Sequence, residues 1–95
     1  MSSNANDFGL LSPTYKQISA SALVKSGVGK LRGVFCSSTT GGTLTLYDNT
    51  AGTGTLLVNT FTLAAATYYD LADVIFGTGL YATIANTAEI TLFYF

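Results

Sequence analysis

The stretch 43–62, TLTLYDNTAGTGTLLVNTFT, constrains the fold more than any other part of the sequence. Its first arm, 43–47, alternates threonine with larger apolar residues, which is the period of a half-buried strand. Residues 48–54 are of types that favour tight turns, and the second arm, 55–62, is rich in residues that favour strands. The stretch therefore predicts two antiparallel strands joined by a glycine-rich turn.

The rest of the chain repeats this pattern, and no convincing helix periodicity occurs in it. Further short strands are expected within 15–26, at 30–38, 68–71, 79–85 and 88–95, with loops at 37–42 and 72–78 and a turn at 86–87. In 30–38, Leu31, Gly33 and Phe35 are expected on one face, and Gly33 indicates a bulge or a close approach of two backbones.

These patterns predict an all-β fold, an antiparallel β-sandwich with a jelly-roll-like arrangement of about seven or eight short strands. The sandwich domain is expected over residues 14–95, and residues 1–13 are expected to form a flexible or docking N-terminal arm. This arm lacks the features of a signal peptide.

The charge composition argues against two classes of partner. Only 9% of the residues are charged, compared with about 25% in an average domain. Three of the four cations, Lys25, Lys30 and Arg32, lie close in sequence and are interpreted as the solvated ends of a hairpin rather than as a phosphate-binding patch. No apolar run approaches the length of a membrane helix. We therefore expect neither a nucleic-acid nor a membrane partner.

The sequence offers little material for catalysis. It has no histidine and one cysteine, Cys36, which is interpreted as a small packed hydrophobe. No acid–base pair is recognisable among the five carboxylates, which are Asp7, Asp48, Asp70, Asp73 and Glu89. The glycine motifs at 26–31 and 77–82 lack the residues or the following helix that phosphate binding requires. We expect no enzyme activity, no cofactor and no metal; the segment 48–50 is interpreted as turn capping rather than calcium binding.

Apolar residues at the two ends of the chain are the candidates for a protein interface. In the last strand, Phe93 and Phe95 alternate with the expected core residues and so face solvent unless another protein covers them. The alternative is that they cover the chain's own segment 74–76. In the N-terminal arm, Phe8, Leu10 and Leu11 are expected to dock on a neighbouring protein or on their own domain. A further set of residues, interpreted either as sugar-stacking platforms or as ordinary packing, consists of Tyr15, Tyr68, Tyr69 and Tyr81.

The segment 44–55, LTLYDNTAGTGT, resembles a hairpin found in small virion proteins of tailed bacteriophages. Weaker similarity extends over roughly residues 19–95. The resemblance implies a β-sandwich that decorates a capsid, commonly as a trimer, and it implies the major capsid protein and other copies of the chain as partners. The implied location is the capsid surface of the virion, after synthesis in the host cytoplasm. The alternative is a receptor- or carbohydrate-binding module of a head fibre or tail spike.

Overall fold

The computed structural model describes residues 12–95, and these residues form six strands and no helix. The strands are β1 (Thr14–Ile18), β2 (Ala22–Ser26), β3 (Gly29–Tyr47), β4 (Leu56–Thr62), β5 (Thr67–Phe76) and β6 (Gly79–Tyr94). All of them pair antiparallel within one sheet. The predicted all-β, antiparallel class is therefore confirmed. Phe8, Leu10 and Leu11 lie outside the described residues.

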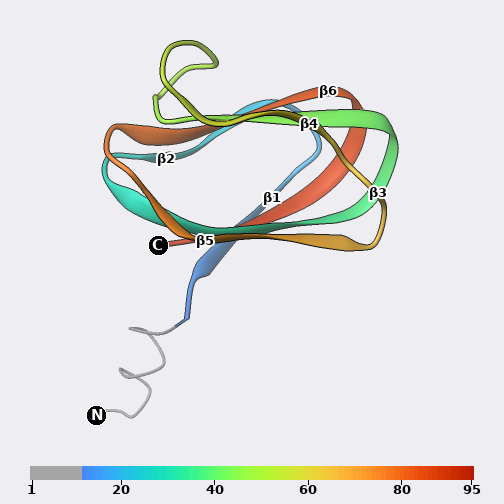
Figure 1. The fold of residues 1–95 in the computed structure, drawn as a ribbon, viewed down its shortest axis with the longest axis horizontal. Coiled ribbons are helices and arrows are strands. Elements are labelled where there is room, and N and C mark those ends of the chain that lie inside the picture. Colours follow the sequence, from blue (N-terminus) through green and yellow to red (C-terminus); the bar gives the residue numbers. More distant parts are fainter. Residues whose placement is uncertain (1–11) are drawn as a thin grey trace.

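The two long strands β3 and β6 form the centre of the sheet. They pair along nearly their whole length, from Leu31 opposite Tyr94 to Tyr47 opposite Tyr81. The first half of β3 also pairs with β5 and its second half with β4, while the two halves of β6 pair with β2 and β1 in turn. Figure 1 shows the sheet folding over at the middle of β3 and β6, so that two layers face each other.

The expected loop at 37–42 and the expected turn at 86–87 are wrong, because both lie inside the long strands. The backbone does bend there: Gly41 and Asn86 have φ angles of 63° and 62°, and the β3–β6 register shifts twice nearby. Side chains hold the bent strands together, since Thr39 Oγ1 donates a hydrogen bond to the Thr87 carbonyl at 3.0 Å and Asn86 Nδ2 donates one to the Gly41 carbonyl at 2.8 Å. Residues typical of turns thus bend a paired ribbon without ending it, and the described residues contain six strands rather than seven or eight.

The expected loop at 72–78 is also wrong, because β5 continues to Phe76. A bulge hides the strand in the sequence: the β3–β5 register shifts between Leu31 and Gly33, and the extra residues on β5 include Ala72 and Asp73, with φ angles of 56° and 54°. After the bulge the alternation resumes, and Phe76 is fully buried.

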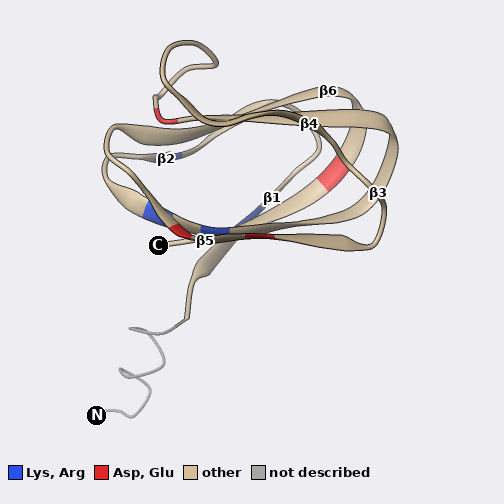
Figure 2. Cartoon of the chain, in the orientation of Figure 1, with Lys and Arg blue, Asp and Glu red and all other residues tan. Residues whose placement is uncertain are grey.

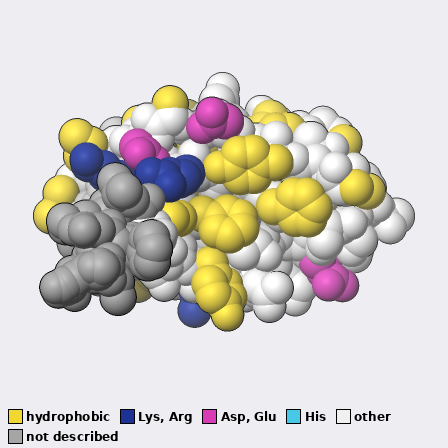
Figure 3. Space-filling model, turned by 90° about the horizontal axis from the view of Figure 1, so that it is seen from below, with side chains coloured by type: hydrophobic (Ala, Val, Ile, Leu, Met, Phe, Trp, Pro, Cys, Tyr) yellow, Lys and Arg dark blue, Asp and Glu magenta, His cyan; other side chains and the backbone are white. Residues whose placement is uncertain are grey.

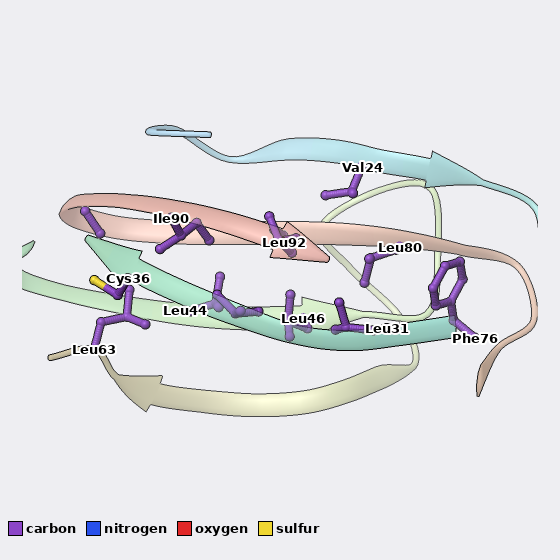
Figure 4. Packing of buried hydrophobic residues seen from close by; sticks show 13 residues of the cluster. Val24, Leu31, Cys36, Leu44, Leu46, Leu63, Phe76, Leu80, Ile90 and Leu92 are labelled. Carbon is purple, nitrogen blue, oxygen red and sulfur yellow. The ribbon is translucent and has the colours of Figure 1, made fainter. Parts of the chain in front are cut away.

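The core lies between the two layers and consists mainly of aliphatic side chains, together with Phe76 and Cys36 (Figure 4). The alternation at 43–47 correctly predicted that Leu44 and Leu46 are fully buried, but Thr45 on the other face is buried as well, with 7% of its surface exposed. In the last strand, Ile90 and Leu92 are buried and Phe93 is only partly covered. The largest fully buried side chains are Phe76, Leu31, Leu44, Leu46, Leu80, Leu92, Val34 and Cys36.

Candidate functional site

Four aromatic side chains gather on the outer face of the layer that contains β1 and β5. We call the set Tyr15, Phe35, Tyr68 and Phe93 the aromatic face. Tyr15 lies opposite Phe93 in the β1–β6 pair, and Phe35 lies opposite Tyr68 in the β3–β5 pair. Tyr15 and Tyr68 are 65% and 45% exposed, and the two phenylalanines are half-buried. Figure 3 shows hydrophobic side chains gathered in the middle of this side of the molecule.

Gly33 lies at the centre of the aromatic face, opposite Phe93 on one side and Asp70 on the other. A β-carbon at Gly33 would collide with the phenol of Tyr68 and would come within 2.7 Å of the Tyr69 carbonyl oxygen. The predicted close approach of backbones at Gly33 is therefore confirmed. Because the glycine leaves this space open, the ring of Tyr68 reaches a centroid distance of 6.2 Å from that of Phe93.

Phe95 lies at the margin of the aromatic face and contacts a charged pair. The guanidinium carbon of Arg32 is 5.0 Å from the centroid of the Phe95 ring, a cation–π contact. Arg32 also donates two hydrogen bonds to the Asp73 carboxylate, from Nε at 2.9 Å and from Nη2 at 3.2 Å. This bidentate pairing lowers the pKa of Asp73 and raises that of Arg32.

The other candidate tyrosines do not join the aromatic face. Tyr69 points the opposite way, into the core margin, where its ring lies 5.1 Å from that of Phe61 and its hydroxyl accepts a hydrogen bond from the Ala64 amide at 2.8 Å. Tyr81 lies on the other layer, paired with Leu23 and with Tyr47. The structure thus brings together Tyr15, Tyr68 and Phe93 from the sequence candidates and separates the rest.

Phe35 is the member of the aromatic face that the sequence pattern misplaced. It was expected on the same face as Leu31, but Leu31 is fully buried and Phe35 lies outside. Both neighbours of β3 shift register at Arg32, which reverses the alternation between these two residues. The one signal for this shift in the sequence was Gly33 within a strand.

Two carboxylates of the described residues have clear structural partners, Asp73 in its pair with Arg32 and Asp48 at the β5–β6 turn. Asp48 accepts hydrogen bonds from the backbone amides of Gly77 at 3.0 Å and Thr78 at 2.8 Å, which lower its pKa. The turn-capping interpretation of this aspartate agrees with these bonds, although the amides belong to the β5–β6 turn. Residues 12–95 contain no group of three or more metal-ligating side chains. Cys36 is buried, and burial raises the pKa of its thiol.

No protein-family model, curated protein or solved structure was found to match the chain. In residues 12–95 there is no helix with the length and hydropathy needed to cross a membrane. The case for a function therefore depends on the surfaces of this molecule.

Proposed function

We propose that the chain is a structural protein of a virion, a capsid decoration (cement) protein of a tailed bacteriophage. It binds the major capsid protein on the capsid exterior and associates with copies of itself, most simply as a trimer. The aromatic face carries this proposal, because four rings on one sheet face leave apolar surface that a protein partner would remove from water. The resemblance of residues 44–55 to phage virion hairpins adds support.

We infer further that the two layers form a β-sandwich of the jelly-roll type. The order of pairing supports this inference. With β3 and β6 each divided at its bend, eight segments result, and they pair in nested fashion: first with last, second with seventh, third with sixth and fourth with fifth. Such nesting arises when one long antiparallel ribbon is rolled up. Jelly rolls occur in viral capsid proteins and in lectins, so the fold is compatible with the proposal without selecting it.

The size of the molecule sets what an interface must involve. A stable protein–protein interface buries about 800 Å² on each partner, roughly a sixth of the 4985 Å² that this molecule exposes. Four aromatic side chains supply the centre of such an interface but not all of it. We therefore propose Phe95 and the N-terminal residues Phe8, Leu10 and Leu11 as further contacts with the same partner.

The oligomeric state and particle binding test this proposal. Native mass spectrometry should find a trimer, and the double variant Tyr15→Ser, Tyr68→Ser should be monomeric. Leu23→Ser is the matched control, because Leu23 is 40% exposed on the opposite layer, and it should leave the trimer intact. A tagged chain supplied during phage growth should band with the particles, and the double variant should not. A monomer that never bands with particles would reject the proposal.

Carbohydrate binding is the second candidate. Tyr15 and Tyr68 are the exposed rings on the same face, and exposed tyrosines side by side on a sheet face are suited to stacking on sugar rings. The chain has no tryptophan and six tyrosines, so the contribution of Tyr15 and Tyr68 to its fluorescence is the part that the double variant loses. Glycans identified on an array should quench this fluorescence in the wild-type chain and not in the double variant. An array without a reproducible hit would remove this candidate.

A further inference from the structure

A hollow of about 510 Å³ lies beside the aromatic face, where β2 turns into β3. We call it the basic hollow. Its walls include Lys25, Val28, Lys30, Arg32, Ile75 and Phe95. These residues come from β2, the β2–β3 turn, β3, β5 and the end of the described chain, so only the folded sheet assembles them. The volume falls within the range of about 300–1000 Å³ typical of small-molecule sites.

The basic hollow collects most of the positive charge of the chain. Three of the four cations line it, together with one carboxylate, Asp73, which leaves a local charge of +2 in a chain whose net charge is −1. Figure 2 shows basic segments of β2 and of the start of β3 near the end where residue 95 lies. Such segregation favours an anion at this end of the molecule.

Two lysines, rather than the arginine, carry the charge that is not neutralised. Asp73 pairs with Arg32, whose guanidinium also lies over the Phe95 ring, so Arg32 mainly shapes the wall. Lys25 Nζ donates one hydrogen bond to the Phe95 backbone oxygen at 3.0 Å, and an ammonium group has three donors. Lys30 is exposed, and its ammonium group donates no hydrogen bond within residues 12–95.

The rest of the lining is apolar. Val28 and Ile75 are 65% and 63% exposed, a high fraction for aliphatic side chains beside a hollow. We propose that the basic hollow binds a small organic anion with an apolar or aromatic body. Its carboxylate, sulfonate or phosphate group meets Lys25 and Lys30, and its body covers Val28 and Ile75. None of the four residues of the aromatic face lines this site, and it shares only Phe95 with the contact proposed above, so its test is separate from the test of the proposed function.

Titration with naphthalene-1-sulfonate, followed by NMR of the backbone amides, tests the site. We expect saturable shifts confined to residues of the basic hollow, and binding at least about fivefold weaker for the neutral analogue naphthalene-1-methanol. Lys30→Gln should weaken binding of the sulfonate about fivefold. Lys16→Gln is the matched control, because it removes the same charge from the cation outside the hollow, and it should bind like the wild type. Val28→Ser should weaken the binding of both the sulfonate and its neutral analogue.

Three results would overturn the proposal. The first is the absence of saturable shifts up to about 10 mM sulfonate, which is weaker than a specific site requires. The second is equal binding of the sulfonate and its neutral analogue, since the lysines would then contribute nothing. The third is an equal loss of sulfonate affinity in Lys30→Gln and Lys16→Gln. Such a result would show that the sulfonate is attracted by the overall charge of the molecule rather than by the hollow. Unchanged spectra outside the hollow verify that each variant is folded.

Discussion

The phenol of Tyr68 fills the space above Gly33 that the β-carbon of any other residue would occupy. Gly33 pairs with Phe93, so the absence of a side chain there lets a ring from β5 approach a ring from β6 across β3. The aromatic face therefore extends without a break over β1, β6, β3 and β5, because β3 has a glycine at position 33.

The substitution Gly33→Ala should destabilise the protein by about 1–3 kcal/mol. The new methyl group meets the phenol of Tyr68 and the Tyr69 carbonyl oxygen, and the carbonyl belongs to paired backbone that cannot easily move. Urea denaturation measures the loss, and near-ultraviolet circular dichroism should change as Tyr68 is displaced. Gly77→Ala is the control, because the nearest atom to its β-carbon is 3.9 Å away, and it should cost less than about 0.5 kcal/mol. Equal stabilities of the two variants would contradict the packing of Tyr68 over Gly33.

The carboxylate of Asp48 should make stability depend on pH. Hydrogen bonds from the Gly77 and Thr78 amides hold its pKa below the ordinary value of about 3.9. A carboxyl group with a lowered pKa contributes stability that is fully present above the unfolded pKa and is lost as the pH falls through the folded pKa. Asp48→Asn should cost about 1 kcal/mol at pH 7 and should flatten the loss of stability below about pH 4.

Glu89→Gln is the control for Asp48→Asn. It removes the same charge, and the Glu89 side chain accepts no hydrogen bond within residues 12–95. Urea denaturation at pH 7 and at about pH 3 should give Glu89→Gln the same acid sensitivity as the wild type. If Asp48→Asn kept the full acid sensitivity, the bonds to the β5–β6 turn would not be its source.

Cys36 should be unreactive in the folded protein. Its side chain is fully buried, burial raises the pKa of the thiol, and the thiolate is the reactive form. A disulfide reagent such as dithionitrobenzoate at pH 8 should label the thiol in guanidinium and leave it unlabelled in buffer. Labelling in buffer as fast as in guanidinium would place Cys36 at the surface.

Replacing Ala66 by glycine should stabilise the protein. Ala66, in the connection between β4 and β5, has a φ angle of 54°, which costs an L-residue about 1–2 kcal/mol and costs glycine little. The greater backbone entropy of unfolded glycine offsets part of this gain, leaving about 0.5 kcal/mol. The melting temperature should rise by a few degrees. Ala65→Gly, at a neighbouring position without a positive φ, should lower it; a fall in both variants would contradict the prediction.

Local alternation predicted the buried side where β3 and β6 pair with each other in regular register. Leu44 and Leu46 in β3, and Ile90 and Leu92 in β6, are all buried as expected. Alternation failed at Arg32, where the register shifts against β5 and β6 and Phe35 moves to the outer face. A register shift depends on the partner strands, so it cannot be predicted from the alternation of residues within one strand.

Turn-forming residues were ambiguous for a related reason. Asn86 and Gly41 have the backbone freedom to reverse the chain, and the sequence at 37–42 and 86–87 reads as loop and turn. In the structure they bend two strands at the same level, where Asn86 donates its hydrogen bond to Gly41. The partner strand decides whether such residues end a strand or bend it, and here the partner residues Gly41 and Asn86 are 45 positions apart in the chain.

The order of the residues predicts the strand-forming pattern, most of the apolar core positions and the shortage of ionisable groups, since these follow from composition and from the two-residue period of a strand. Which aromatic residues share a surface, and which cations share a hollow, depends instead on how distant strands pair in the folded chain. Tyr15 and Phe93 are far apart in the chain and become neighbours through the β1–β6 pair. Lys25 and Phe95, also far apart in the chain, meet through the hydrogen bond that Lys25 Nζ donates to the Phe95 backbone oxygen. Nested pairing brings the first described strand, β1, beside the last, β6, and these contacts form only when the whole sheet has folded.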